Sequence, residues 1–337
     1  MEIKDVLLDS EITRVRSFLK SYGLIYEDDI TVTLIATEGD EIVATASAAH
    51  NIIKCVAVRE SSQGEGVLNT LMSRLIKRLH ASDIKHLFVY TQPELVDVFE
   101  SLGFKTIVQS MNMTFMEQNG DITNTLTRVK KKYDVSPAPK GSVVINANPL
   151  TQGHVHLIEH ARKHHDEVIV FVVSEDRSFF PFKDRFEIIK RTFEGCEGIV
   201  IVPTKNYLVS YATFPKYFLS KEATIKKEHA LIDVLTFKQY YMKIFNITAR
   251  YVGDEPYSPM TSVYNATMRD YLGKDLNIIE RKTFDGTPIS ASTVRKLLRK
   301  NGLSAIKAYV PKPTYDYLFS EKGQRIIRKL KDHHDRH

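Results

Sequence analysis

Short apolar runs alternate with polar turns along the first third of the chain, and the spacing of the apolar residues differs between runs. Some runs combine β-branched and small apolar residues, which favours strands. Two others repeat apolar side chains every three or four positions, which predicts amphipathic helices. The expected strands are 31–36, 42–49, 52–58, 86–91 and 104–116, and the expected helices are 66–79 and 94–102.

The middle of the chain shows a more regular alternation of strand and helix patterns. Buried β-branched runs are separated by amphipathic segments of about a dozen residues. This order is typical of an α/β fold with a parallel sheet and crossover helices. The expected order is strand 142–147, helix 153–165, strand 167–173, helix 183–194 and strand 198–202.

A change of composition near residue 130 predicts a domain boundary. Lys130 to Lys132 is a run of cations, and Pro137-Ala138-Pro139 followed by Gly141 indicates a stiff, exposed connector. We therefore expect a first domain over residues 1–130, a linker over 131–141 and a second domain over 142–337.

Composition narrows the class of protein. The 337 residues are 43% hydrophobic and 26% charged, which is ordinary for globular domains, and no apolar run reaches the roughly 20 residues of a membrane-spanning helix. The first residues lack a signal-peptide pattern, so we expect a cytoplasmic protein without a membrane partner. We expect Cys55 and Cys196 to be buried thiols. The net charge is +6, but the sequence contains no basic motif with interleaved aromatic residues, so we expect no nucleic-acid partner.

A glycine-containing loop follows the strand that ends at Val58. The segment Gln63-Gly64-Glu65-Gly66 stands between that strand and the predicted helix 66–79. Glycines let a ligand approach the backbone, and unpaired N–H groups at a helix start attract anions. The pattern therefore predicts an anion site in the first domain.

Residues 1–117 resemble the GNAT acyltransferases on this motif. Gln63, Gly64 and Gly66 match the family's loop, while Leu68 stands where the family has a small residue. The resemblance implies a mixed-sheet GNAT-like domain whose loop grips the pyrophosphate of coenzyme A. Two functions stay open: an active acetyltransferase, or a domain without catalysis that still holds a CoA-like arm.

Two further segments in the second domain suit a nucleotide. The strand ending near Ala147 continues through Asn148-Pro149 into Thr151-Gln152-Gly153-His154 at a helix start, where His154 can donate to a phosphate oxygen. Far downstream, Ser290, Ser292 and Arg295 open another predicted helix. Helix capping alone would explain the serines but not the arginine at this spacing.

Together these segments resemble the cytidylyltransferase-like nucleotidyltransferases. Ala291, Ile145 and Ala147 depart from the usual pattern of that superfamily. The resemblance implies a Rossmann-like parallel-sheet domain. It also implies catalytic roles for His154, Thr151 and Arg295. The implied nucleotide-binding residues are Asn148, Gly153, His154, Ser290, Ser292 and Arg295.

Signals for the second substrate are weaker. Lys183 and Arg185 follow a strand of the expected sheet and could neutralise an anionic substrate or pyrophosphate, or belong to a solvated helix start. Asp254 and Glu255 could contact the ribose or a metal. The terminal residues 333–337 contain three histidines, for which a frayed tail is the simpler interpretation.

The combination of both domains resembles the citrate lyase ligase family, most closely over 146–159 and 250–265. The resemblance implies that ATP and acetate give acetyl-adenylate and pyrophosphate. The acetyl group then passes to the thiol of the citrate lyase acyl carrier subunit, on a dephospho-CoA-like arm, and AMP is released. Mg²⁺ is expected with the triphosphate, and the metal ligands stay unassigned. Gln63, Gly64 and Gly66 are the candidate contacts for the arm.

Three other functions stay open from the residues alone. The first is an adenylyltransferase that makes a dinucleotide from phosphopantetheine or nicotinamide mononucleotide. The second is an acetyl-CoA-dependent acetyltransferase with an accessory second domain. The third is a nucleotide sensor without catalysis that binds a partner protein.

Overall fold

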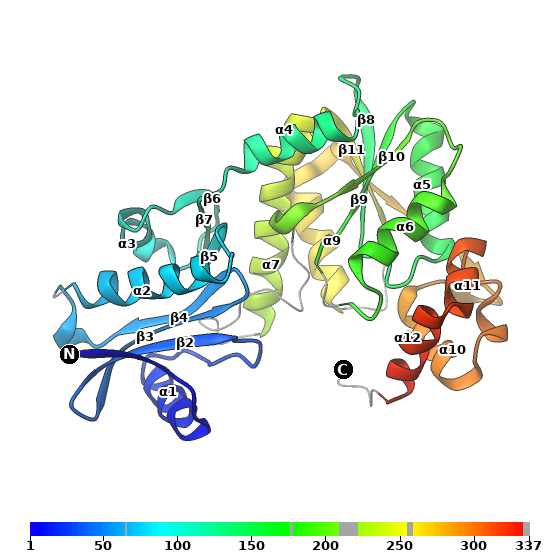
Figure 1. The fold of residues 1–337 in the computed structure, drawn as a ribbon. Coiled ribbons are helices and arrows are strands. Elements are labelled where there is room, and N and C mark those ends of the chain that lie inside the picture. Colours follow the sequence, from blue (N-terminus) through cyan, green and yellow to red (C-terminus); the bar gives the residue numbers. More distant parts are fainter. Residues whose placement is uncertain (65, 176–177, 209–221, 255–258, 333–337) are drawn as a thin grey trace. The chain divides into compact units, whose positions relative to one another are not determined.

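The computed structural model describes residues 1–64, 66–175, 178–208, 222–254 and 259–332 (Figure 1). The chain forms two compact units. The first unit contains residues up to Ile122 and the beginning of helix α7, through Ile232. The second contains the rest of the described chain, including the end of α7 from Asp233.

The first unit is built on a sheet with helices on both faces. Its sheet order is β1-β2-β3-β4-β5-β7-β6, and it is mixed because β4 and β5 run parallel while the other neighbours run antiparallel. Its strands are β1 (Glu2–Asp5), β2 (Val32–Glu38), β3 (Glu41–Ala49), β4 (Ile52–Val58), β5 (Leu87–Thr91), β6 (Lys105–Gln109) and β7 (Thr114–Gln118). Its helices are α1 (Asp9–Ser21), α2 (Val67–Ala81), α3 (Val96–Ser101) and the first part of α7 (Glu222–Thr236).

Helices α1 and α2 cover opposite faces of this sheet, as Figure 1 shows. Leu71, Met72 and Leu75 of α2 are fully buried against one face, in line with the helical spacing in the sequence. Val15 and Leu19 of α1 are fully buried on the other face, beside Cys55.

The expected single strand over 104–116 is wrong, because the segment forms two antiparallel strands. β6 and β7 are joined by a turn at Ser110, whose backbone N–H donates to the Met113 carbonyl at 2.8 Å. The Ser110 hydroxyl oxygen also accepts from the backbone N–H groups of Met113 and Asn112. Short polar side chains stabilise such turns by bonding to nearby backbone groups.

The second unit contains a parallel sheet, as the alternating pattern predicts, in the order β10-β9-β8-β11-β12. Its strands are β8 (Lys140–Ile145), β9 (Val168–Val172), β10 (Ile199–Pro203), β11 (Ile247–Gly253) and β12 (Leu276–Ile279), with a small hairpin of β13 (Thr283–Phe284) and β14 (Thr287–Pro288). Its helices are α4 (Ile122–Lys132), α5 (Gln152–His164), α6 (Phe182–Thr192), the end of α7, α8 (Met242–Phe245), α9 (Pro259–Leu272), α10 (Ala291–Asn301), α11 (Lys312–Phe319) and α12 (Glu321–Asp332).

Both faces of this sheet are covered, which explains its nearly continuous apolar strands. In β9, Val168, Val170 and Val172 face the cluster formed with α5 and α6, whereas Phe171 contacts aromatic rings that include Phe245 of α8. The chain proceeds from β8 to one side of the sheet and later returns to β11 on the other side. The carboxyl ends of β8 and β11 therefore form the switch point at which open α/β sheets bind ligands.

The expected linker differs from the structure at both of its ends. Lys130 to Lys132 end helix α4, and all of α4 after Ile122 lies with the second unit. Lys140 is fully buried at the start of β8, where its ammonium donates to the Ser136 carbonyl at 2.9 Å, so it is not an exposed linker cation. The division into domains at 131–141 stays a prediction.

The expectation for the cysteines is half right. Cys55 is buried in the first unit, and burial raises the pKa of its thiol to about 12. Cys196 is exposed, because it lies in the turn between α6 and β10 instead of on either element. Among the described helices, none is long and apolar enough to cross a membrane.

Candidate functional site

A pocket of about 390 Å³ lies in the second unit at the carboxyl ends of β8, β11 and β12. Both sequence segments that suit a nucleotide line it, although more than 130 residues separate them along the chain. This is the place that the strand order predicts for a ligand. The polar and small residues of its lining are Asn146, Thr151, Gly153, His154, His156, Gly253, Asn265, Glu280, Arg281, Lys282, Ser290, Ala291, Ser292 and Arg295.

Gly153 allows the two segments to meet. A β-carbon added at this position would lie 2.6 Å from the backbone carbonyl oxygen of Ile289, a distance that side chains do not tolerate. The start of α5 therefore packs directly against the residues that precede Ser290. This glycine is needed for the contact between the two segments, whereas the sequence suggested only a close approach to the ligand.

Thr151 and His154 form a reciprocal cap at the start of α5. The Thr151 hydroxyl oxygen accepts from the His154 backbone N–H at 3.4 Å, and the Thr151 backbone N–H donates to His154 Nδ1 at 3.0 Å. Because Nδ1 accepts, the neutral ring carries its proton on Nε2. Burial, together with the smaller effect of the Arg281 charge, lowers the pKa of His154 to about 4. His154 is thus a neutral hydrogen-bond donor at physiological pH.

The second segment is organised by Ser290, the N-cap of α10. Its hydroxyl oxygen accepts from the Thr293 backbone N–H at 3.1 Å and lies 2.8 Å from the Ser292 hydroxyl oxygen. Arg295, one turn further along, donates from Nη1 to the Asn148 carbonyl at 2.6 Å. Arg295 therefore holds the loop between β8 and α5 while it lines the pocket.

Asn148 supports the loop and does not line the pocket. Its side-chain oxygen accepts from the backbone N–H of Phe180 at 3.1 Å, and its carbonyl accepts from Arg295. The position that the sequence suggests for nucleotide contact thus serves to connect the β8–α5 loop to its surroundings.

Lys183, Arg185 and Asp254 also lie outside the pocket lining. Arg185 is 1% exposed, and its guanidinium donates to backbone carbonyls that include those of Asn146 at 2.7 Å and Phe180 at 2.9 Å. These bonds fix the loops around the end of β8, so this cation has a structural task. Lys183 and Asp254 are exposed. Glu255 and the terminal residues 333–337 lie outside the described residues.

The sequence analysis missed the run Glu280-Arg281-Lys282, which lines the pocket directly after β12. Arg281 donates from Nε to the Asp254 carbonyl at 2.6 Å, so it connects the ends of β11 and β12. The signal was available, because charged residues that follow a parallel strand lie at the binding edge of the sheet. Because β12 was not predicted, the position of Arg281 at the pocket was not predicted either.

Tyr264 is a second wall residue that the sequence analysis did not assign. Its hydroxyl donates to the buried carboxylate of Asp233 and accepts from Arg250 Nη2 at 3.1 Å. The Arg250 guanidinium also lies over the Phe237 ring, 4.2 Å from its centroid. This network fixes the orientation of the Tyr264 ring at the pocket.

The lining of this pocket offers little for a resident metal. Among its described residues Glu280 is the only carboxylate, and no three His, Cys, Asp or Glu side chains of the described chain gather as metal ligands. The cations and hydroxyls instead suit phosphate oxygens. This donor set fits a magnesium ion that is carried by a triphosphate, since Mg²⁺ is often held mainly by phosphates and water.

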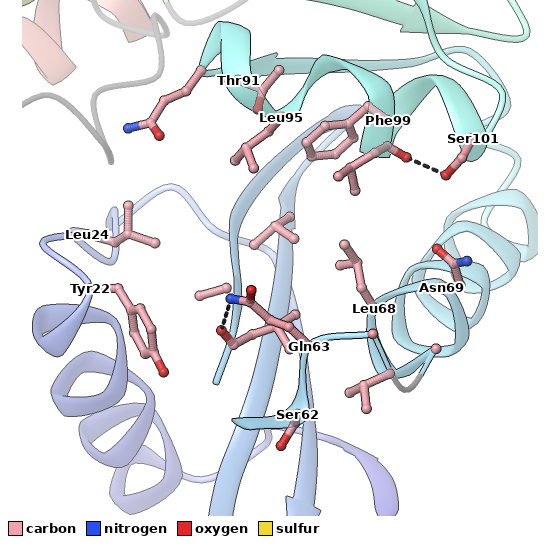
Figure 2. A pocket seen from close by; sticks show the side chains of 18 residues that line it. Tyr22, Leu24, Ser62, Gln63, Leu68, Asn69, Thr91, Leu95, Phe99 and Ser101 are labelled. Carbon is pink, nitrogen blue, oxygen red and sulfur yellow. Dashed lines mark hydrogen bonds between the residues drawn. The ribbon is translucent and has the colours of Figure 1, made fainter. Parts of the chain in front are cut away.

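A separate pocket of about 600 Å³ lies in the first unit and contains the predicted glycine loop (Figure 2). Gly64 and Gly66 have φ of +86° and +73°, which favours glycine, and a β-carbon at either would project into open space. Gln63 donates to the Val58 carbonyl at 3.4 Å, and Leu68 of α2 lines the same pocket. The three candidate residues for a CoA-like arm are therefore together at the start of α2.

This pocket differs from the other in its chemistry. Apart from Tyr22, its described lining contains no ionisable side chain. Leu24, Leu95, Val98 and Phe99 contribute apolar side chains to the lining. Figure 2 shows Leu24 on the opposite side of the pocket from Leu68. Such a lining suits an extended, mostly uncharged chain, with the backbone N–H groups of the loop at one end.

Comparisons with known proteins match two segments of the chain to two different families. The family described as "Citrate lyase ligase C-terminal domain" matches residues 140–318, and the family described as "Acetyltransferase (GNAT) domain" matches residues 17–116. A protein of Escherichia coli (strain K12) named "[Citrate [pro-3S]-lyase] ligase" is 34% identical over 319 residues, which cover 92% of this chain and 91% of that protein. The chain belongs to the citrate lyase ligase family. It is therefore an enzyme of the ligase class, as expected from the resemblance.

Other relatives extend the picture. The protein of the same name from Haemophilus influenzae is 34% identical over 91% of this chain and 95% of its own length. A phosphopantetheine adenylyltransferase of Campylobacter hominis is 34% identical over 67 residues, 19% of this chain and 42% of that protein. Among solved structures, Escherichia coli ElaA covers 35% of this chain and 99% of its own, at 20% identity and a TM-score of 0.31. The family matches confirm the expected fold class, a GNAT-like mixed-sheet domain with a parallel-sheet domain.

Proposed function

We propose that this citrate lyase ligase family member acetylates the thiol of the citrate lyase acyl carrier subunit, with ATP and acetate as the other substrates. The observation that carries the proposal is that two distant segments line one pocket at the switch point of the sheet. The residues are Thr151, Gly153 and His154 from one segment, and Ser290, Ser292 and Arg295 from the other. Donors and a cation that converge there suit the phosphates of a nucleotide.

In the first step, an acetate oxygen attacks the α-phosphorus of ATP while the bond from that phosphorus to the bridging oxygen breaks. Acetyl-adenylate forms and pyrophosphate leaves with the electron pair. His154 would donate from Nε2 to an α-phosphoryl oxygen as negative charge develops. Thr151 would keep the ring in this tautomer, since its backbone N–H donates to Nδ1.

The start of α10 would hold the far end of the triphosphate. Ser290 and Ser292 offer hydroxyls and Arg295 offers a forked cation to the β- and γ-phosphates and to the leaving pyrophosphate. Mg²⁺, when bound with the nucleotide, supplies charge neutralisation of the triphosphate oxygens. Lys282, three residues after the end of β12, is in the same lining and adds positive charge.

In the second step, the carrier thiol attacks the acetyl carbonyl carbon, the thiol proton passes to solvent, and AMP leaves. The apolar pocket of the first unit would hold the dephospho-CoA-like arm of the carrier, with the pyrophosphate at the loop of Gln63, Gly64 and Gly66. The lack of an acid or base other than Tyr22 in its described lining supports binding of the arm without catalysis there.

The test is a trapping assay with ATP, labelled acetate and hydroxylamine. We expect acetohydroxamate and pyrophosphate in equal amounts without carrier, and an acetylated carrier when it replaces hydroxylamine. Turnover of labelled acetyl-CoA in place of ATP and acetate would instead support an acetyltransferase. Binding of ATP without pyrophosphate release in either assay would support a nucleotide sensor.

A second candidate function is adenylyl transfer to phosphopantetheine. The 67-residue match to a phosphopantetheine adenylyltransferase favours it. ATP supplied with 4′-phosphopantetheine would then give dephospho-CoA and pyrophosphate, and acetate would have no effect on pyrophosphate release. We expect acetate to be required.

A further inference from the structure

The basic residues of the chain are concentrated on its last helices. Residues 291–332 contain eleven Lys and Arg against three Asp and Glu, a net charge of +8. The whole chain has a net charge of only +6, so the remaining residues together sum to −2. The positive charge is therefore concentrated in residues 291–332 of the second unit.

These residues surround a small helical cluster whose interior is apolar. Val294 and Leu298 of α10 pack with Leu318 of α11 and with Ile326 and Ile327 of α12. The three helices gather at one end of the second unit, in orange and red in Figure 1. Since the apolar positions point inward, the cations of α10 and α12 lie on the outer surface of this cluster.

Most of the cations on this surface are not neutralised within the described chain. Lys312, Lys322 and Arg325 form ion pairs with Asp316, Asp184 and Glu321. The structure shows no ion pair or hydrogen bond to another described residue for the side chains of six further cations, all exposed. These six, which we call the basic surface, are Lys296, Lys300, Lys307, Arg328, Lys329 and Lys331.

The basic surface begins at the pocket. Helix α10 starts with Ser292 and Arg295 in the lining, and Lys300 lies about 8 Å further along the helix axis at 1.5 Å per residue. Phe319, the last residue of α11, adds an apolar side chain that is 59% exposed beside this charge. A central aromatic residue with charged residues around it is typical of protein interfaces.

We propose that the basic surface of α10–α12 is the docking site for an acidic face of the carrier protein whose thiol is acetylated. This inference rests on the proposed function for the identity of the partner. Opposite charge accelerates the encounter of two proteins and fixes their orientation. Docking beside α10 places the carrier next to the pocket in which its acetyl group is activated. A polyanion such as DNA is the other ligand that this charge would attract.

Two charge-reversal pairs test the proposal, one at the end of α10 and in the loop after it, and one on α12. The first is Lys300→Glu in α10 with Lys307→Glu between α10 and α11, and the second is Arg328→Glu with Lys329→Glu. We expect each pair to raise the KM for the carrier about tenfold, and acetohydroxamate formation without carrier to stay within twofold of wild type. Lys131→Glu with Lys163→Glu, two exposed cations elsewhere in the second unit, is the charge-matched control and should change neither reaction. If the reversal on α12 harms folding, Arg328→Gln with Lys329→Gln takes its place. This neutral pair should raise the KM for the carrier by a smaller factor.

Salt gives an independent measurement. The affinity of fluorescently labelled carrier for the wild-type enzyme should fall between 50 and 300 mM NaCl, and the reversal variants should show a flatter dependence. The proposal would be overturned if the reversal variants had an unchanged KM for the carrier, or a rise in KM equal to that of the control pair. It would also be overturned if these variants lost binding to duplex DNA but kept their binding to the carrier. A wild-type enzyme that forms no acetohydroxamate would contradict the proposed function instead. The carrier affinities of wild type and variants, measured without ATP, still decide whether the surface docks it.

Discussion

Both pockets lie at a strand, a loop and a helix that follow one another in the same order, but the side chains that line the two pockets differ. In each, a strand ends, a glycine-containing loop turns, and a helix begins at the ligand side: β4 to α2 in the first unit and β8 to α5 in the second. The second pocket adds His154, Arg281 and Arg295 to this device, whereas the first adds apolar residues and Tyr22. A helix start can bind an anion in both, but only the second has side chains suited to developing charge.

The glycines show the same difference. Gly66 has a positive φ and open space beside it, so it serves the turn and leaves room for a ligand. Gly153 has no unusual φ but lies against the Ile289 carbonyl, so it serves the packing of one motif on the other. Two glycines that look alike in sequence therefore differ in structure: one lies beside open space, and the other lies against the backbone of a distant segment.

The largest expected effect concerns His154, and it tests whether the second pocket is the site of chemistry. His154→Ala should lower acetohydroxamate formation about 100- to 1000-fold, the usual effect of removing one donor to a developing oxyanion. ATP should still bind within an order of magnitude. His160→Ala, on the same helix but outside the lining, is the control. Pyrophosphate release at a near-normal rate in His154→Ala would assign His154 to capping alone.

The next effect concerns Gly66, and it tests whether the first pocket holds the carrier arm. Gly66→Val places a branched side chain in the open space of the loop, so acetylation of the carrier should fall about tenfold or more while acetyl-adenylate still forms. Gly39→Val is the matched control, because Gly39 also has a positive φ and open surroundings but lies outside the pocket. Circular dichroism checks folding of both. Carrier acetylation at the wild-type rate in folded Gly66→Val would mean that the arm is held elsewhere.

A smaller effect is expected at Arg295. Arg295→Lys keeps the charge but loses the fork that can bind both the Asn148 carbonyl and a phosphate, so the affinity for ATP should fall about tenfold. Arg191→Lys makes the same substitution at an exposed position of α6 and should leave the affinity unchanged. The measurement is ATP titration of both variants. Equal affinities of Arg295→Lys and Arg191→Lys for ATP would mean that Arg295 has only a structural role at the start of α10.

Much of this architecture could be predicted from the sequence, because local patterns dominate it. The period of Leu71, Met72 and Leu75 predicts α2, and the run of β-branched residues in β9 predicts a strand that is buried on both faces. Thr151 to His154 and Ser290 to Arg295 could be singled out because helix starts with hydroxyls and cations are local signals.

The rest depended on contacts between distant residues. Nothing next to Arg185 in the sequence shows that its guanidinium binds the Asn146 carbonyl, and nothing next to Gly153 shows the Ile289 carbonyl. Arg281 was missed because the short strand β12, only Leu276–Ile279, is too brief for its pattern to be recognised. The turn at Ser110 shows the opposite error, since its polar residues were read as part of one strand.

The smallest expected effect comes from the burial of His154, and it tests its neutral state directly. With a pKa of about 4 in the folded protein and the ordinary 6.5 when unfolded, the ring binds a proton more readily in the unfolded chain. Stability from this group is therefore complete above pH 6.5 and is lost as the pH falls from 6.5 towards 4. Between pH 7 and pH 5.5 the wild-type enzyme should lose about 1 kcal/mol more of its free energy of unfolding than His154→Gln. Urea unfolding at both pH values measures this, and comparing the two losses removes the constant cost of the Thr151 hydrogen bonds. Equal losses in both proteins would show that the ring titrates normally in the pocket, and that the donor in the proposed first step is not held in its neutral form by the fold.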